Sequence, residues 1–270
     1  MRRLARRLAL LAALAVPGGP VAADGLEVDL ELILMVDVSR SMTERELEIQ
    51  RRGYAEALQS DPVFAALQSG LLQRVAMAYV EWAGWGSQRM IVDWRLLQTR
   101  ADLDAFARTL TAEFDPALRR TSISGALLYA AESLDGNAYD GLRRVIDVSG
   151  DGPNNQGRPV ERARDAVIGR GITVNGLPLM TQEGMGSQWH LDDLDAYYRD
   201  CVIGGPGAFL IPVHDWDDFA EAVKRKLVLE MVWRPPPGPI PAQYAPRDRY
   251  DCLIGEKIWE RYFGDDLWLP

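Results

Sequence analysis

The residues best suited to chemistry in this sequence are one acid and two hydroxyls at alternate positions, Asp37, Ser39 and Ser41. They follow an apolar run, residues 30–36, whose length and composition predict a buried strand of a parallel sheet. Open α/β sheets bind their ligands at the carboxyl ends of such strands. Because all three side chains offer oxygen, the pattern favours a hard divalent cation such as Mg²⁺ or Mn²⁺.

Two further oxygen-bearing residues are expected at the same edge. Thr121 precedes a predicted helix over residues 122–134, and Asp151 follows a predicted strand over residues 143–149. The carboxyl ends of neighbouring parallel strands bring their loops together, so these side chains are expected near Asp37. Taken singly, such residues serve as helix caps or turn formers. Taken together, the five predict one metal site of two carboxylates and three hydroxyls.

Strand and helix patterns alternate along the chain. Strands are predicted over residues 30–36, 74–83, 89–97, 143–149, 172–179 and 208–213. Helices are predicted over residues 44–60, 62–72, 101–114, 122–134, 159–171 and 191–202, with a last one capped by Asp215. The short turn at 84–86 predicts a hairpin. This alternation predicts an α/β fold, a Rossmann-like doubly wound, mainly parallel sheet with one antiparallel edge strand.

The motif residues in this order resemble the metal-ion-dependent adhesion site (MIDAS) of the von Willebrand factor type A (VWA) family. The resembling residues are Asp37-Val38-Ser39-Arg40-Ser41, then Thr121, then Asp151-Gly152. The resemblance covers about residues 27–231. Segments 34–42, 145–155 and 201–205 narrow it to exported bacterial VWA-like proteins of undefined function. In one departure, two arginines precede Thr121, where the family often has glycine.

The resemblance implies how the site would work. Ser39 and Ser41 would coordinate the cation, Thr121 would do so directly or through water, and Asp37 and Asp151 would supply charge. A carboxylate from a protein partner would then complete the coordination shell. The resemblance therefore implies a metal-dependent protein-binding module of the adhesion type and no enzyme.

Two other functions stay open. One is a metal-dependent hydrolase that uses the same site to activate water, with Asp147 or Asp151 recruited as a base. The other is a structural or assembly subunit with a vestigial site. Against catalysis, the chain has no Gly-x-Ser-x-Gly motif and no phosphate-binding glycine loop, and neither His190 nor His214 is obviously near a nucleophile.

Three polar residues near the site are expected to have structural roles. Asp147 lies inside a predicted strand, so it is expected to pair with Arg143 or Arg144 or to face outward. Asn154 and Asn155 follow Asp151 in a loop, where asparagine commonly shapes turns.

Residues 1–23 have the plan of a signal peptide: arginines, an apolar segment over 8–16 and small residues before position 24. The alternative is an uncleaved anchor. No later segment is apolar for long enough to form a membrane helix, so the mature chain is expected to have no transmembrane segment. We therefore expect a periplasmic or secreted protein.

Composition limits the partners. Removal of four leader arginines would take the formal net charge from −9 to about −13, which makes nucleic acid an improbable partner. The apolar fraction of 47% is enough for a core.

The cysteines and prolines predict how the chain ends. Cys201 and Cys252 are the two cysteines, and an even count in an exported protein favours a disulfide, with two buried thiols as the alternative. Residues 24–233 form the predicted VWA-like domain, and residues 234–243 a stiff proline-rich linker. The tail, residues 244–270, is too short to fold alone, so it is expected to pack on the domain.

Overall fold

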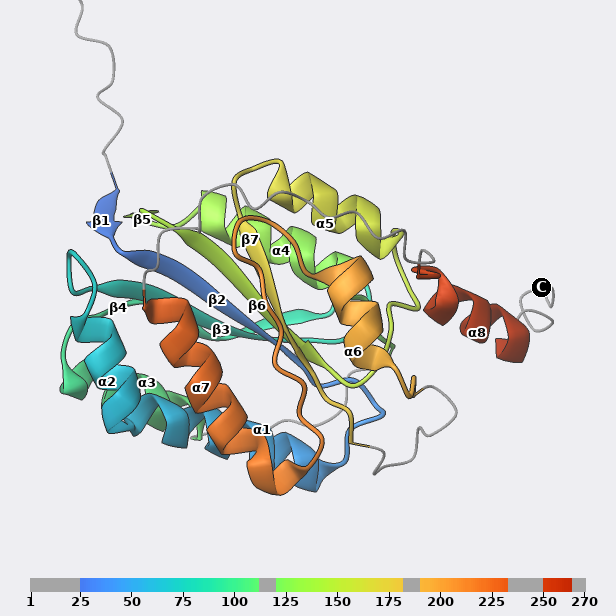
Figure 1. Cartoon of the computed structure of the whole chain (residues 1–270), viewed down its shortest axis with the longest axis horizontal. Helices are drawn as coiled ribbons and strands as arrows, with labels where there is room; N and C mark the ends of the chain where they lie inside the picture. Colours follow the sequence, from blue (N-terminus) through green and yellow to red (C-terminus); the bar gives the residue numbers. More distant parts are fainter. Residues whose placement is uncertain (1–24, 112–119, 182–189, 233–249, 264–270) are drawn as a thin grey trace, which may run out of the picture.

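The computed structural model describes residues 25–111, 120–181, 190–232 and 250–263 (Figure 1). The predicted leader, the proline-rich linker and the end of the helix expected over 101–114 lie outside the described residues.

A five-stranded sheet forms the centre of the fold, in the order β4-β3-β2-β6-β7. Its strands are β2 (Leu30–Asp37), β3 (Val75–Trp82), β4 (Gln88–Leu97), β6 (Arg144–Gly150) and β7 (Thr173–Pro178). β4 is antiparallel to β3, and the other neighbours are parallel. The predicted doubly wound, mainly parallel sheet with one antiparallel edge strand is therefore confirmed. The middle strand, β2, is buried along its whole length and ends at Asp37.

Helices cover both faces of this sheet (Figure 1). One face is covered by α1 (Glu44–Gln59), α2 (Asp61–Gln68), α3 (Arg100–Leu110) and α7 (Phe219–Met231), and the other by α4 (Ile123–Asp135), α5 (Val160–Ile168) and α6 (Leu194–Tyr197). Successive residues of β2 alternate between the two cores, with Leu34 in one and Met35 in the other. A fully buried side chain of this size contributes about 1.5–3 kcal/mol, so both layers hold β2 firmly.

The helix after the motif begins at the predicted capping box. The Thr43 hydroxyl accepts a hydrogen bond from the Glu46 N–H (3.3 Å), and the Glu46 carboxylate accepts one from the Thr43 N–H (2.6 Å). These two hydrogen bonds satisfy backbone N–H groups that have no partner inside the helix, so they fix where α1 begins, shortly after Ser41.

The prediction of a strand over residues 208–213 is wrong. This segment makes only isolated bridges to the β7 side, between Leu210 and Gly176 and between Val213 and Leu179. Pro212 has no N–H to donate, and Gly205 and Gly207 have positive φ angles of 92° and 72°. Because Pro212 cannot donate a backbone hydrogen bond and the two glycines turn the chain just before the segment, no regular series of strand hydrogen bonds forms.

The helix predicted over 191–202 is shorter and less regular than expected. It consists of α6 (Leu194–Tyr197) followed by a π-helical turn (Tyr198–Val202). The last predicted helix begins as a 3-10 turn at Trp216, after the predicted cap Asp215, and continues as α7.

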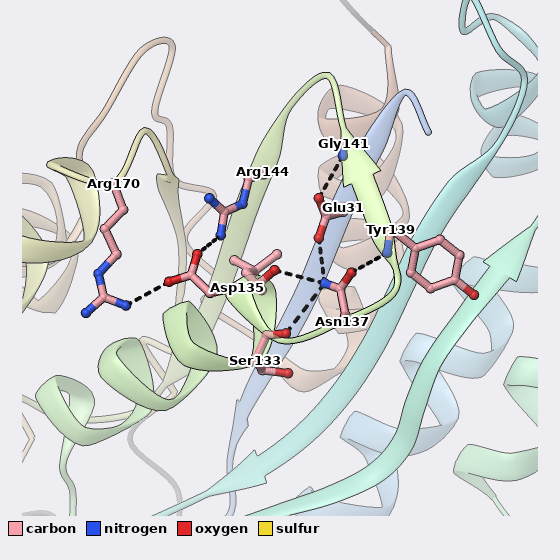
Figure 2. Close-up of polar contacts among 9 residues, drawn as sticks. Glu31, Ser133, Asp135, Asn137, Tyr139, Gly141, Arg144 and Arg170 are labelled. Atoms are coloured by element: carbon pink, nitrogen blue, oxygen red, sulfur yellow. Dashed lines mark hydrogen bonds and ion pairs between the residues drawn. The ribbon is translucent and has the colours of Figure 1, made fainter. Parts of the chain in front are cut away.

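A small second sheet was not predicted. It pairs β1 (Leu26–Val28) with β5 (Tyr139–Gly141) in parallel, near the start of β2. Figure 2 shows how Glu31 of β2 holds it: its carboxylate accepts hydrogen bonds from the Gly141 N–H (2.7 Å) and from the Asn137 side chain (2.5 Å). These strands have three residues each, too short for a periodic signal in the sequence.

Ion pairs fix the end of α4 beside this small sheet. Asp135, the last residue of α4, pairs with Arg144 of β6 and with Arg170 (3.1 Å) (Figure 2). These pairs are partly exposed, so they add little stability beyond orientation.

Asp147 neither pairs with Arg143 or Arg144 nor faces outward. It is buried against Lys226 of α7, whose Nζ lies 2.8 Å from Asp147 Oδ1 and 2.7 Å from Glu230 Oε1. Burial, together with the nearby Glu230 charge, raises the pKa of Asp147 to about 7. One ammonium thus compensates two buried acids and ties α7 to the sheet.

Replacing Lys226 with methionine is expected to lower the free energy of unfolding by about 3–5 kcal/mol, because it leaves two buried acids without their cation. Urea denaturation measures the loss. The matched control is Lys224→Met on the same helix, whose ion pair with Glu221 is more exposed, with an expected change within about 0.5 kcal/mol. Equal losses in both variants would contradict this role for Lys226.

The structure contains a disulfide between Cys201 and Cys252. It joins the π-helical turn to the tail, where α8 (Ile254–Phe263) forms. Tyr250 and Ile254 pack against the core on the α4 side of the sheet. The first described residues of the tail, Tyr250 to Ile254, therefore lie against the main fold.

Replacing both cysteines with serine is expected to lower the free energy of unfolding by about 4 kcal/mol, because the denatured chain loses a cross-link. Urea denaturation of the oxidised protein and the double variant measures the difference. Reducing agent should weaken the wild type to the level of the variant and leave the variant unchanged. Equal stability of all three would show that the cross-link contributes nothing.

Candidate metal centre

The five predicted ligands come from three loops at the carboxyl edge of the sheet. Asp37 is the last residue of β2, and Asp151 directly follows β6, the neighbouring strand. Thr121 stands one residue before Ser122, the N-cap of α4. Four of the five residues are buried, and Ser41 is partly exposed.

Hydrogen bonds join four of these residues into one chain. The Ser39 N–H donates to Asp37 Oδ1 (2.7 Å), the hydroxyl oxygens of Ser39 and Ser41 lie 3.0 Å apart, and the Ser41 hydroxyl donates to Asp151 Oδ1 (2.9 Å). The sequence separates Ser41 from Asp151 by 110 positions, and the parallel pairing of β2 with β6 brings them together.

Thr121 is tied to the same edge through its backbone. Its N–H donates to the Asn155 side-chain oxygen (3.0 Å), and its carbonyl accepts from the Asn155 N–H (3.0 Å). The loop that carries Thr121 is therefore fastened to the loop that begins at Asp151.

The two acids of the site are buried without a full set of partners. Burial, together with the charge of Asp151, raises the pKa of Asp37 well above its usual value, and burial also raises the pKa of Asp151. Asp37 Oδ2 is buried and has no hydrogen-bond partner among the described residues. A buried carboxylate oxygen left in this state is costly, and a cation would remove that cost.

The donor set fits a hard divalent cation. Two carboxylates and neighbouring hydroxyls are the oxygen ligands that Mg²⁺ and Mn²⁺ prefer. Among the residues that the structure describes, no three His, Cys, Asp or Glu side chains gather as metal ligands. Hydroxyls must therefore contribute to any cation site at this edge.

Gly150 leaves room for two side chains beside the site. A Cβ at this position would meet the Tyr198 hydroxyl at 2.8 Å and Asp37 Oδ2 at 2.9 Å. Burial and the Asp37 charge raise the pKa of Tyr198 well above its usual value. Tyr198 could not be predicted from the sequence, because its position beside Gly150 depends on a π-helical turn far along the chain.

The tail helix α8 contacts both outer loops of the site. The side-chain Nδ2 of Asn154 donates to Glu256 Oε1 (2.7 Å), and the side-chain Oδ1 of Asn154 accepts from the Ser124 N–H (2.9 Å). The Arg120 guanidinium lies 4.7 Å from the ring centre of Trp259. Asn154 is thus more than a turn former, and α8 connects the loops that carry Thr121 and Asp151.

His190 also lies beside the site. Its Nε2 is 3.8 Å from Asp151 Oδ2, and its side chain is 8% exposed. Neither ring nitrogen has a hydrogen-bond partner among the described residues. A lone histidine in a loop carries no signal in a single sequence, so its position emerges only from the structure.

Three solved structures share this fold. They are proximal thread matrix protein 1 from the mussel byssus with a zinc-occupied MIDAS motif (13% identity, TM-score 0.52), the pilus adhesin SpaC from Lactobacillus rhamnosus GG (11%, 0.55) and a von Willebrand factor type A protein from Catenulispora acidiphila (16%, 0.53). The matches cover 77%, 78% and 75% of this chain, and 49%, 30% and 43% of those chains. This chain therefore matches less than half of each neighbour's length.

These likenesses, with the sheet order and the motif positions, define a VWA-like fold. No curated protein shows significant similarity to the chain. Residues 27–235 match the family described as "Protein of unknown function (DUF1194)", and the chain belongs to that family. The predicted resemblance to VWA proteins, and to a group among them without a defined function, is confirmed.

In chelator-treated protein, Asp37 should make stability fall as pH rises. Its folded-state pKa is raised, so the folded protein holds a proton that the unfolded chain releases above about pH 4. Asp37→Asn should remove this part of the pH dependence, measured by urea denaturation at pH 5 and pH 8.

The control for this measurement is Asp251→Asn. A hydrogen bond from Lys257 lowers the pKa of Asp251, so the stability that this acid adds is already complete above its ordinary pKa, and Asp251→Asn should leave the change in stability between pH 5 and pH 8 as in the wild type. If the stability of Asp37→Asn changes with pH as that of the wild type does, Asp37 does not have a raised pKa in the folded protein.

Proposed function

We propose that the protein is an exported protein-binding module whose partner offers a carboxylate to a divalent cation, Mg²⁺ or Mn²⁺. The cation would be held by Asp37, Ser39, Ser41, Thr121 and Asp151. One observation carries the proposal: two buried acids and linked hydroxyls meet at the carboxyl edge of the sheet, and one acid oxygen has no hydrogen-bond partner among the residues that the structure describes.

Each residue has a defined part in this proposal. The hydroxyls of Ser39 and Ser41 are neutral oxygen donors, and Asp37 and Asp151 balance the charge of the cation. When bound, the cation supplies an electrophilic position that attracts a carboxylate. The backbone clamp between Thr121 and Asn155 keeps the third loop at the same edge before any ligand arrives.

The neighbours in fold support a binding role. One is described with a zinc-occupied MIDAS motif, and another is a pilus adhesin. The Cys201–Cys252 disulfide supports export, because such bonds persist in oxidising compartments. Among the described residues, no helix is long and apolar enough to cross a membrane.

Calorimetry on the chain from residue 24 onward tests the metal site. The wild type is expected to bind Mg²⁺ and Mn²⁺, and Asp37→Ala with Asp151→Ala is expected to bind neither, because both charges of the site are lost. The matched control replaces two acids away from the site, the exposed Asp61 and the partly exposed Asp104, and should bind like the wild type.

Capture of the partner tests the second half of the proposal. Wild-type protein fixed to a resin should retain a partner in Mg²⁺ and release it in chelator, and the Asp37, Asp151 double variant should retain none. Metal-independent capture would point to a structural subunit with a vestigial site. Chelator-sensitive turnover of a phosphoester or ester would point to a hydrolase.

A further inference from the structure

We propose that His190 is a further ligand of the cation at this edge, so that the site selects an imidazole-binding transition metal such as Zn²⁺ over Mg²⁺. The proposal rests on the metal site proposed above, and it adds the choice of metal. It also brings a fourth segment, the one before α6, into the site.

The position of His190 is difficult to explain without a bound group. Its distance of 3.8 Å from Asp151 Oδ2 is too long for a hydrogen bond, which spans about 2.7–3.2 Å. Its ring is almost fully buried, and neither nitrogen has a partner among the described residues. Buried polar groups in folded proteins are nearly always satisfied, so the buried nitrogens of His190 are suited to binding a ligand beside Asp151.

The same distance suits two ligands of one metal ion. Zinc binds imidazole nitrogen at about 2.0–2.1 Å and carboxylate oxygen at about 2.0–2.2 Å, so two such ligand atoms lie at most about 4.3 Å apart. The separation of 3.8 Å between His190 and Asp151 falls inside this limit. A shared cation therefore accounts for a spacing that a direct hydrogen bond does not.

Glu46, a further acid near Asp151, already accepts hydrogen bonds on both of its carboxylate oxygens. Glu46 raises the pKa of Asp151 by its charge, but Glu46 Oε1 accepts from the Trp216 indole (3.0 Å) and Oε2 from the Thr43 N–H (2.6 Å). Glu46 thus completes the capping box of α1, whereas the ring nitrogens of His190 and Asp37 Oδ2 have no hydrogen-bond partner in the described part of the chain.

The nature of the added ligand sets the preference for metal. Mg²⁺ is bound by oxygen and keeps several waters, whereas imidazole is a common ligand of zinc and other transition metals. A site in which His190 and Asp151 bind the cation beside the hydroxyls, with Asp37 balancing charge, therefore gains affinity for Zn²⁺ that it does not gain for Mg²⁺.

Calorimetry with Zn²⁺ and with Mg²⁺ on the full chain from residue 24 onward tests the proposal. His190→Gln should weaken Zn²⁺ binding at least about tenfold and change Mg²⁺ binding less than about twofold. His214, the other of the two histidines, is exposed, so His214→Gln is the matched control and should bind both metals like the wild type.

Pulsed electron paramagnetic resonance gives a readout that a general loss of stability would not produce. Mn²⁺ bound to the wild type should show coupling to a nitrogen nucleus. The coupling should persist in His214→Gln and disappear in His190→Gln. His190→Ala serves as a second variant, and circular dichroism checks that each variant is folded.

The outcomes separate this proposal from the one on which it rests. If the Asp37, Asp151 double variant loses both metals while His190→Gln binds Zn²⁺ like the wild type without nitrogen coupling in either protein, the metal site stands and His190 is no ligand. If the double variant still binds metal like the wild type, the site itself is wrong, and the assignment of His190 fails with it.

Discussion

The structure at the carboxyl edge of the sheet depends on holding two carboxylates close together away from water. β2 and β6 are parallel neighbours, so Asp37 and Asp151 must emerge at the same edge. Like charges in a buried place repel each other, and burial alone already disfavours their ionised forms. The amide of Ser39 and the hydroxyl of Ser41 compensate part of this cost, and a bound cation would compensate the remainder.

The two ends of β2 carry buried acids that differ in how fully their carboxylate oxygens are hydrogen-bonded. Glu31, near the start of the strand, is buried and receives hydrogen bonds from Asn137 and Gly141 on its two carboxylate oxygens. Asp37, at the other end, is buried and keeps one oxygen without a partner among the described residues. The strand therefore carries an acid with both oxygens hydrogen-bonded near its start and, at its end, an acid with one oxygen that has no partner among the described residues.

The fold could be predicted because its signals are local. The apolar run before Asp37, the capping box at Thr43 and the alternation of elements required no knowledge of distant residues, and the motif order placed Asp37 and Asp151 on neighbouring strands. The partner of Asp147 could not be found, because Lys226 lies far along the chain while two arginines stand nearby in sequence. His190 had no local signal for the same reason, since its neighbour Asp151 belongs to a different loop.

The attachment of α8 has a consequence for the order in which this edge is completed during synthesis. All five strands precede Cys252 and Glu256 in the chain, yet Glu256 holds Asn154, and the disulfide holds α8 in place. A growing chain can form the sheet and both core layers before these last contacts exist. The loops that carry Thr121 and Asp151 reach their final support only after the tail has emerged and its thiol has been oxidised, so this edge of the sheet is the last part of the fold to be completed.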